Sequence, residues 1–178
     1  MKIRQLSYSL CLTGALSFFP LHNVVAAPAG APTSERAYQV WKYTTVKPGS
    51  GWQSKSFGDS KWKSGKAGFG TKGTPGIGKL GTIWKTKDIW LRRTFNPGAL
   101  TASQIAKLNV RNYHDEDIEV FINGVLAYSA KGYVTRYESK PISSAARNAI
   151  VSGGTNVIAV HCHQTQGGQY IDVGLEVK

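Results

Sequence analysis

The sequence predicts an all-β protein, an antiparallel β-sandwich. Three observations support this prediction: short segments with alternating apolar residues, an Asn-Gly pair between two of them, and turn residues in the intervening stretches. Several short strand-like runs separated by Gly, Pro, Asn and Asp are typical of a sandwich. Only Ser143 to Ile150 has the pattern of a helix.

The strand pattern is clearest in the second half of the chain. Ile118, Val120 and Ile122 alternate with more polar residues, and Asn123-Gly124 joins this run to residues 125–128. Asn-Gly favours a type I′ turn, which needs positive φ at both central positions, so we expect a hairpin here. Further strands are expected at 89–95, 108–113, 157–163 and 170–177.

Residues 41–87 have little periodicity and many Gly, Lys and Ser residues. Their aromatic density is too high for a disordered segment, because disordered chains lack aromatic residues. We therefore expect long loops that aromatic side chains anchor to the core, namely Trp41, Trp52, Trp62, Phe69 and Trp84.

The N-terminus has the pattern of a cleavable signal peptide over residues 1–26. Lys2 and Arg4 precede an apolar run, and Val24-Val25-Ala26 fits the small-residue cleavage rule. The run is short for a membrane span, so the mature form is expected to be secreted or periplasmic, without a span. Residues 27–36 are expected as a flexible leader and 37–178 as a single β-sandwich domain. Cys162 is then the one remaining cysteine, which excludes an intramolecular disulfide.

The positive charge is concentrated in the first half of this domain. The chain has a net charge of +12, and residues 36–93 contain 13 Lys or Arg against two acidic residues. From residue 94 onward the count is seven against seven. A basic half favours polyanions such as acidic polysaccharides, or it serves solubility alone. No nucleic-acid reader motif is present, so specific nucleic-acid binding is not expected.

Four motifs in order resemble the galactose-binding-like jelly-roll domain, as in the sugar-binding domains of β-galactosidase-like and related glycoside hydrolases. They cover most of residues 41–178 and lie at 57–62 with 68–70 and 89–95, at 121–125, at 154–160 and at 170–175. The resemblance implies carbohydrate binding or a structural role. In such hydrolases the domain accompanies a catalytic barrel, which residues 37–178 do not include, so catalysis is not carried over. Nucleophile-elbow, zinc-protease and P-loop motifs are absent from the sequence.

The loop at 164–170 is dense in side-chain amides, which both donate and accept hydrogen bonds as sugar hydroxyls require. An ordinary polar hairpin loop is the alternative interpretation. Tyr170 and Asp172 share a strand face and add a ring and a carboxylate. The candidate ligand-binding residues are Tyr113, His114, His163, Gln164, Gln166, Gln169, Tyr170 and Asp172.

Two groups of residues are candidates for metal binding. Asp115, Glu116 and Asp117 offer oxygen ligands to a structural calcium, with a solvated acidic turn as the alternative. His161 and His163 lie on one strand face, and with His114 they form a hypothetical zinc site. Two polar residues at a strand end are the alternative interpretation.

A non-catalytic carbohydrate-binding module, for acidic or cell-surface glycans, is the function that these patterns favour. One alternative is a structural or protein-interaction domain that partners a separately encoded enzyme or an envelope component. A less favoured alternative is a metal-dependent hydrolase that uses the three histidines. The first hypothesis requires no cofactor, and residues 115–117 are its candidate site for an optional structural calcium.

Overall fold

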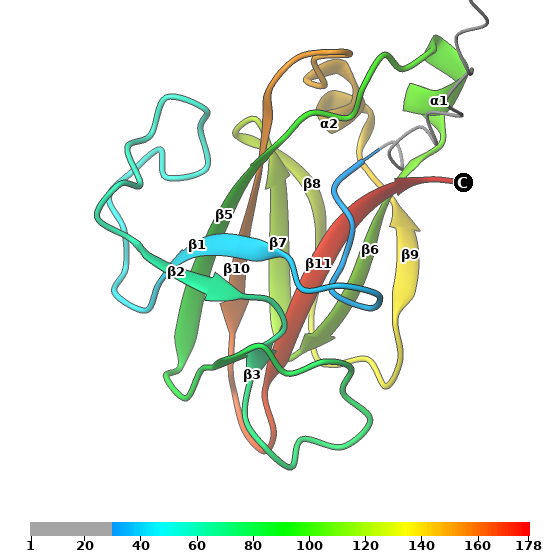
Figure 1. Cartoon of the computed structure of the whole chain (residues 1–178). Helices are drawn as coiled ribbons and strands as arrows, with labels where there is room; N and C mark the ends of the chain where they lie inside the picture. Colours follow the sequence, from blue (N-terminus) through cyan, green and yellow to red (C-terminus); the bar gives the residue numbers. More distant parts are fainter. Residues whose placement is uncertain (1–29) are drawn as a thin grey trace, which may run out of the picture.

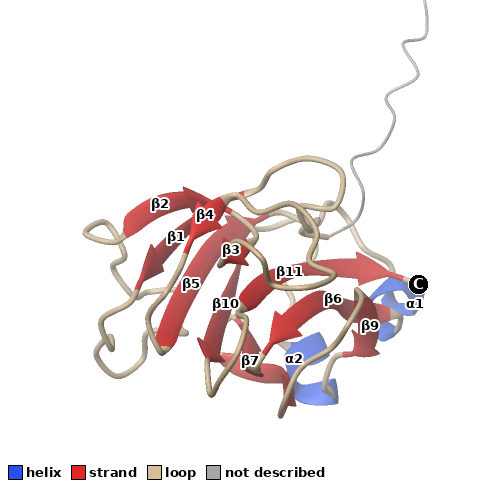
Figure 2. Ribbon diagram, turned by 90° about the horizontal axis from the view of Figure 1, so that it is seen from below, coloured by secondary structure: helices blue, strands red, loops and turns tan. Residues whose placement is uncertain are grey.

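Two β-sheets pack face to face in the computed structural model, which describes residues 30–178 (Figures 1 and 2). One sheet has the strand order β2-β1-β5-β10-β7-β8, and the other has the order β4-β3-β11-β6-β9. All pairings are antiparallel except β3 with β4. The predicted antiparallel β-sandwich is confirmed. The elements are β1 (Val40–Thr44), β2 (Lys63–Lys66), β3 (Phe69–Gly70), β4 (Thr82–Ile83), β5 (Asp88–Phe95), α1 (Ala102–Ala106), β6 (Leu108–Asp115), β7 (Asp117–Ile122), β8 (Val125–Ala130), β9 (Glu138–Pro141), α2 (Ser144–Asn148), β10 (Asn156–His163) and β11 (Tyr170–Val177).

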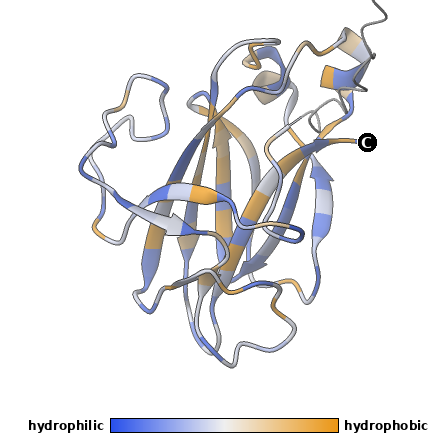
Figure 3. Cartoon of the chain, in the orientation of Figure 1, coloured by the Kyte–Doolittle hydropathy of each residue, from blue (hydrophilic) through white to orange (hydrophobic). Residues whose placement is uncertain are grey.

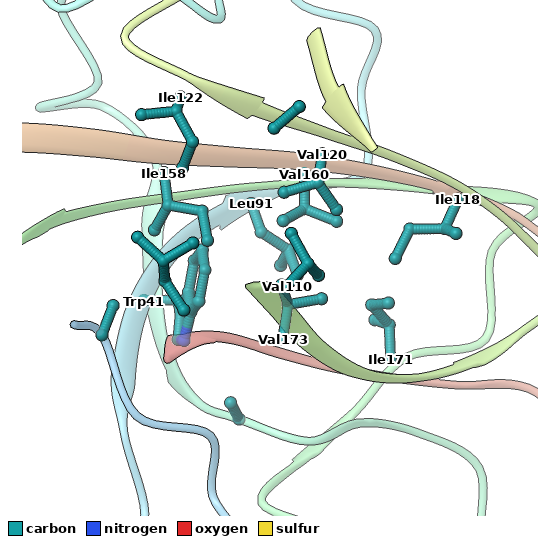
Figure 4. Close-up of a cluster of buried hydrophobic side chains, with 14 of the residues drawn as sticks. Trp41, Leu91, Val110, Ile118, Val120, Ile122, Ile158, Val160, Ile171 and Val173 are labelled. Carbon is teal, nitrogen blue, oxygen red and sulfur yellow. The ribbon is translucent and has the colours of Figure 1, made fainter. Parts of the chain in front are cut away.

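The main core lies between the two sheets (Figure 4). Apolar residues at every second position of a strand point to one face, so each central strand contributes a row of side chains. Ile158 and Val160 of β10 thus meet Val110 of β6 and Ile171 and Val173 of β11. The alternation is visible along the strands in Figure 3. Cys162 continues the β10 row and is fully buried, which raises the pKa of its thiol.

A second, smaller core forms on the outer face of the six-stranded sheet. Trp52 from the β1–β2 loop packs on Trp90, Val157 and Ala159. Trp62, expected in the core, is half-buried at the edge of this cluster. The region expected as long loops, 41–87, also contains the four short strands β1 to β4.

Arg92 ties the β1–β2 loop to this second core. Its guanidinium is buried, pairs with Asp59 at 2.9 Å and donates hydrogen bonds to the Trp52 and Ser54 carbonyls. Arg92 is therefore a structural cation and is not free to bind a ligand.

The expected hairpin is present between β7 and β8. Asn123 has φ 51° and Gly124 has φ 91°, as a type I′ turn requires. Helix α2 lies within the predicted helical stretch 143–150. Helix α1 was not predicted, although Thr101 and Gln104 form a capping box that marks its start.

The described part of the expected leader packs on the domain. Ala31 exchanges backbone hydrogen bonds with Leu175 of β11, at 3.0 and 2.6 Å. Glu35 pairs with Arg111 of β6 at 2.7 Å. The close approach depends on Gly174, because a Cβ there would lie 2.5 Å from the Ala31 carbonyl oxygen. Ala31, Ser34 and Glu35 of the expected leader thus contact the domain at β6 and β11.

The predicted signal peptide, residues 1–26, lies outside the described residues. Among residues 30–178, no helix has the length and apolar character that a membrane crossing requires.

Candidate functional site

The candidate residues gather at one end of the sandwich, where β5 and β7 begin, β10 ends and β11 begins (lower end in Figure 1). The loops at 115–117 and 164–169 meet there, because the Thr165 hydroxyl donates a hydrogen bond to Glu116. The backbone N–H of Gln164 donates to the Lys87 carbonyl at 2.7 Å. The loop proposed for calcium and the loop proposed for sugar binding are therefore neighbours.

An open polar cluster lies here on the outer face of the six-stranded sheet. We name it the imidazole–carboxylate cluster, and it consists of Asp88, Glu119, His161 and His163. Asp88 Oδ1 lies 2.8 Å from His161 Nε2 and 2.8 Å from His163 Nδ1. The other ring nitrogen of His161, Nδ1, lies 3.3 Å from Glu119 Oε2. Each ring nitrogen of His161 thus faces a carboxylate.

Strand register places these side chains together. His161 of β10 lies between Trp90 of β5 and Glu119 of β7, and His163 lies directly opposite Asp88. The Trp90 and His161 rings are stacked, with centroids 4.9 Å apart and planes 6° apart. Residues directly opposite on neighbouring strands share one face, so the pairing alone orients the cluster.

The cluster borders a surface hollow. Its walls are Asp117, Ile118, Glu119, Ser129, Ala130, Lys131, His161 and His163. The side chains of His161, His163 and Asp88 are 22, 34 and 28% exposed. Partial burial of Asp88 would raise the pKa of its carboxyl, but the hydrogen bonds from His163 and His161 outweigh this, and its pKa lies below the ordinary value.

A closed polar cluster lies on the outer face of the five-stranded sheet. We name it the tyrosine–aspartate cluster, and it consists of Tyr113, Tyr137, Tyr170 and Asp172. The Tyr137 hydroxyl donates to Asp172 Oδ2 at 2.6 Å and lies 3.3 Å from the Tyr170 hydroxyl. The Tyr113 ring makes edge contacts with the rings of Tyr137 and Tyr170, at centroid distances of 5.6 and 5.2 Å.

Covering segments bury the tyrosine–aspartate cluster. The backbone N–H of Ser34 donates to Asp172 Oδ2 at 2.7 Å, and the Tyr170 hydroxyl donates to the Lys79 carbonyl at 3.0 Å. Tyr170 and Asp172 are 0 and 1% exposed. Burial raises the pKa of Asp172 to about 6, against the lowering effect of the hydrogen bonds from Tyr137 and Ser34. Burial likewise raises the pKa values of Tyr137 and Tyr170.

The remaining predicted ligand-binding residues lie in different surroundings. The side-chain amides of Gln164 and Gln169 are buried and donate hydrogen bonds to backbone carbonyls. Gln164 donates to the carbonyls of Gln166 and Gly168, and Gln169 donates to that of Thr86. Gln166 itself is exposed on the loop. Of the eight predicted ligand-binding residues, His163 and Gln166 are accessible, and the other six are buried.

The proposed three-histidine site is not formed. His114 pairs across β6 and β11 with Ile171, a core residue, so its ring points between the sheets. His161 and His163 point outward from the other sheet, because they alternate with the core residue Cys162. The third potential metal ligand beside His161 and His163 is Asp88. Within residues 30–178, these three form the one group of three potential metal ligands that lie close together.

The three acidic residues proposed for calcium do not converge on one point. Asp117 accepts hydrogen bonds from Lys131 and from the Gly132 N–H, at 2.6 and 2.8 Å. Glu116 binds Thr165, and burial raises the pKa of Asp115. Asp115 ends β6 of one sheet and Asp117 begins β7 of the other, so adjacent carboxylates do not by themselves make a calcium site.

Asp88 and Glu119 are the site residues that the sequence did not single out. Each lies in an ordinary strand pattern, and its role depends on which strand pairs with β10. The Trp90 and His161 stack depends on the same pairing. Local sequence offered no signal for these contacts.

Comparison with known proteins finds similarity of fold. No family model and no curated protein matches the chain. Solved structures of glycoside hydrolases do: a β-glucuronidase from glycoside hydrolase family 2 at 14% identity and a TM-score of 0.53, with 85% of this chain and 18% of that chain covered. A family 2 member from Bacteroides cellulosilyticus matches at 12% identity and a TM-score of 0.56, with 84% of this chain and 21% of that chain covered. The Lactobacillus rhamnosus β-glucuronidase matches at 16% identity and a TM-score of 0.53, with 85% of this chain and 29% of that chain covered.

The chain therefore spans less than a third of these enzymes' length and shares the fold of one β-sandwich region within them. The expected likeness to a domain of glycoside hydrolases is confirmed at the level of fold.

Proposed function

We propose that this protein is a non-catalytic carbohydrate-binding domain and that the saccharide lies in the hollow beside the imidazole–carboxylate cluster. One observation carries the proposal: polar side chains of three neighbouring strands converge on an accessible hollow, in a fold that occurs within glycoside hydrolases. Fold alone does not specify a ligand, so the chemistry of the hollow is the main support.

The hollow offers the mixed donors and acceptors that sugar hydroxyls need. The Glu119 carboxylate accepts hydrogen bonds, the Lys131 ammonium donates them, and the Ser129 hydroxyl does both. His163 and Gln166 are the predicted ligand-binding residues that remain accessible in this region. In this proposal the buried ones, such as Tyr170 and Asp172, hold the start of β11 in place and do not contact the sugar.

Acidic glycans are the proposed ligand class, because lysines border the site. Lys131, a wall residue of the hollow, is 89% exposed, and Lys85 and Lys87 are exposed in the segment that precedes Asp88. A uronate or sulfate group can pair with these ammonium groups while its neutral hydroxyls enter the hollow. Similar folds occur within β-glucuronidases, whose name refers to an acidic sugar.

Glycan-array screening of the full chain, followed by calorimetry with the best oligosaccharide, tests the proposal. We expect a dissociation constant in the micromolar to millimolar range. The double variant Lys131→Ala, Glu119→Gln should weaken binding at least fivefold. Glu138→Gln, which removes a carboxylate paired with Lys140 on β9, is the matched control and should bind like the parent protein. Absence of binding to any glycan at millimolar concentration refutes the proposal and favours a protein-interaction domain.

Export is part of the proposal, since it would place the domain where polysaccharides are found. If residues 1–26 are a signal peptide, N-terminal sequencing of protein recovered from the periplasm or the medium should begin at Ala27. Recovery of the intact N-terminus in the cytoplasm would contradict it. A separately encoded enzyme is the proposed partner class.

A further inference from the structure

Three donor atoms of the imidazole–carboxylate cluster converge on one point. His161 Nε2 and His163 Nδ1 each lie 2.8 Å from Asp88 Oδ1, and one ligand atom from each of the three residues lies within 4.8 Å of the other two. A zinc ion with bonds of about 2.0–2.1 Å holds tetrahedral ligands roughly 3.3 Å apart. Small side-chain rotations therefore suffice to admit an ion among these atoms.

The supporting contacts resemble those of a built metal site. A ligating imidazole is commonly oriented by a carboxylate at its other nitrogen. Glu119 occupies this position for His161, with Oε2 3.3 Å from Nδ1. The stacked Trp90 ring restricts the His161 ring from the opposite strand. Three ligands thus lie on regular strands, with one of them held by two further side chains.

The donor set indicates the class of ion. Two imidazole nitrogens and one carboxylate oxygen suit zinc and its first-row neighbours, whereas calcium and magnesium take oxygen ligands. Three protein ligands leave a fourth position open, and His161 and His163 line the surface hollow. Partial exposure of all three side chains gives an ion a path from solvent.

We propose that Asp88, His161 and His163 bind a divalent first-row transition metal of the zinc class, with an open coordination position toward the hollow. Glu119 is a positioning residue for His161. The inference does not depend on carbohydrate binding, because it rests on the three donors alone. A glycan that binds equally well with and without the ion would leave the metal proposal intact.

Metal titration of the full chain tests the proposal, without a histidine tag and after treatment with chelator. We expect one equivalent of Zn²⁺ by calorimetry with a micromolar dissociation constant. Co²⁺ should give visible d–d absorption between about 500 and 650 nm, characteristic of a four- or five-coordinate site. Zn²⁺ should also raise the unfolding temperature, because an ion that binds only the folded state stabilises it.

Variants separate ligands from neighbours. His163→Gln, His161→Gln and Asp88→Asn should each weaken Zn²⁺ binding at least tenfold and abolish the Co²⁺ spectrum, while circular dichroism stays unchanged. Glu119→Gln should weaken binding about tenfold and leave a shifted Co²⁺ spectrum, as expected of a positioning residue. Glu138→Gln is the matched control and should bind metal like the parent.

Two results would overturn the proposal. One is no binding of Zn²⁺ or Co²⁺ by the parent protein at 100 micromolar, about a hundredfold above the expected dissociation constant. The other is unchanged metal binding in a variant that lacks all three ligands, because the ion would then be bound elsewhere.

Discussion

The two polar clusters lie at the same end of the sandwich, one on the outer face of each sheet, and differ in what covers them. Over the tyrosine–aspartate cluster lie residues 31–36 and the loop at Lys79, so that Tyr170 is 0% exposed. No segment of residues 30–178 closes the imidazole–carboxylate cluster in this way, and His163 keeps a side-chain exposure of 34%.

The difference shows that burial by other segments of the chain, and not residue type, decides whether a polar cluster is available to a ligand. Aromatic rings and a carboxylate suit sugar binding in principle, yet in the closed cluster they satisfy one another and the covering backbone. Carboxylates and imidazoles of the open cluster face one another and solvent, so they remain available to a ligand. We therefore expect the closed cluster to govern stability and the open cluster to govern binding.

Truncation of Tyr170 should produce the largest effect. Tyr170→Ala removes a fully buried ring and its hydrogen bond to the Lys79 carbonyl, and we expect a loss of about 3–5 kcal/mol of unfolding free energy. Urea unfolding monitored by fluorescence measures the loss. A loss below about 1 kcal/mol would contradict the assignment of the closed cluster to stability.

The pH dependence of stability should follow Asp172. Its folded pKa of about 6 lies above the ordinary value of 3.8, so the contribution of Asp172 to stability is fully present below about pH 4 and is lost as pH rises through the folded pKa. The carboxyl faces Tyr137, Tyr170, Glu35 and Arg93. A shift of about two units corresponds to at most about 3 kcal/mol.

Asp172→Asn should remove this component. The variant is expected to be at least as stable as the parent at pH 7.5, with a flatter profile between pH 4 and 7 in chemical denaturation. Glu138→Gln should retain the parent's slope. Identical profiles for Asp172→Asn and the parent would show that the carboxyl does not titrate in this range.

A substitution at Gly174 can displace the segment that covers the tyrosine–aspartate cluster. A Cβ at this position would lie 2.5 Å from the Ala31 carbonyl oxygen, so Gly174→Ala should displace residues 31–36 at a cost of about 1–3 kcal/mol. Limited proteolysis should cleave the displaced segment faster. Gly58→Ala, where a Cβ meets no atom within 4 Å, is the matched control and should leave cleavage unchanged.

A substitution in the imidazole–carboxylate cluster should have the smallest effect on stability. His163→Asn is expected to alter the unfolding free energy by about 0.5 kcal/mol or less in the presence of chelator, because the side chain is partly exposed and its neighbours can be solvated. Thermal unfolding measures this. A loss as large as that of Tyr170→Ala would mean that the open cluster is structural.

Local chemistry made part of this architecture predictable. The Asn123-Gly124 turn and the alternating strands followed from positive-φ and period-2 requirements that a few neighbouring residues impose. The buried Asn156 amide binds the backbone of Val151 and Gly154 and so stabilises the turn that leads into β10. Helix α1 escaped prediction because only its capping box marks so short a helix.

The sequence by itself determined the β-sandwich and its hairpin, because alternation and turn chemistry act over a few residues. Only the tertiary structure decided at which end the polar loops meet and which polar residues are accessible. His114 faces the core, Asp88 joins His161 and His163, and Ser34 covers Asp172. These outcomes depend on strand pairing and on contacts between residues far apart in the chain, such as Ser34 and Asp172, which no local pattern encodes.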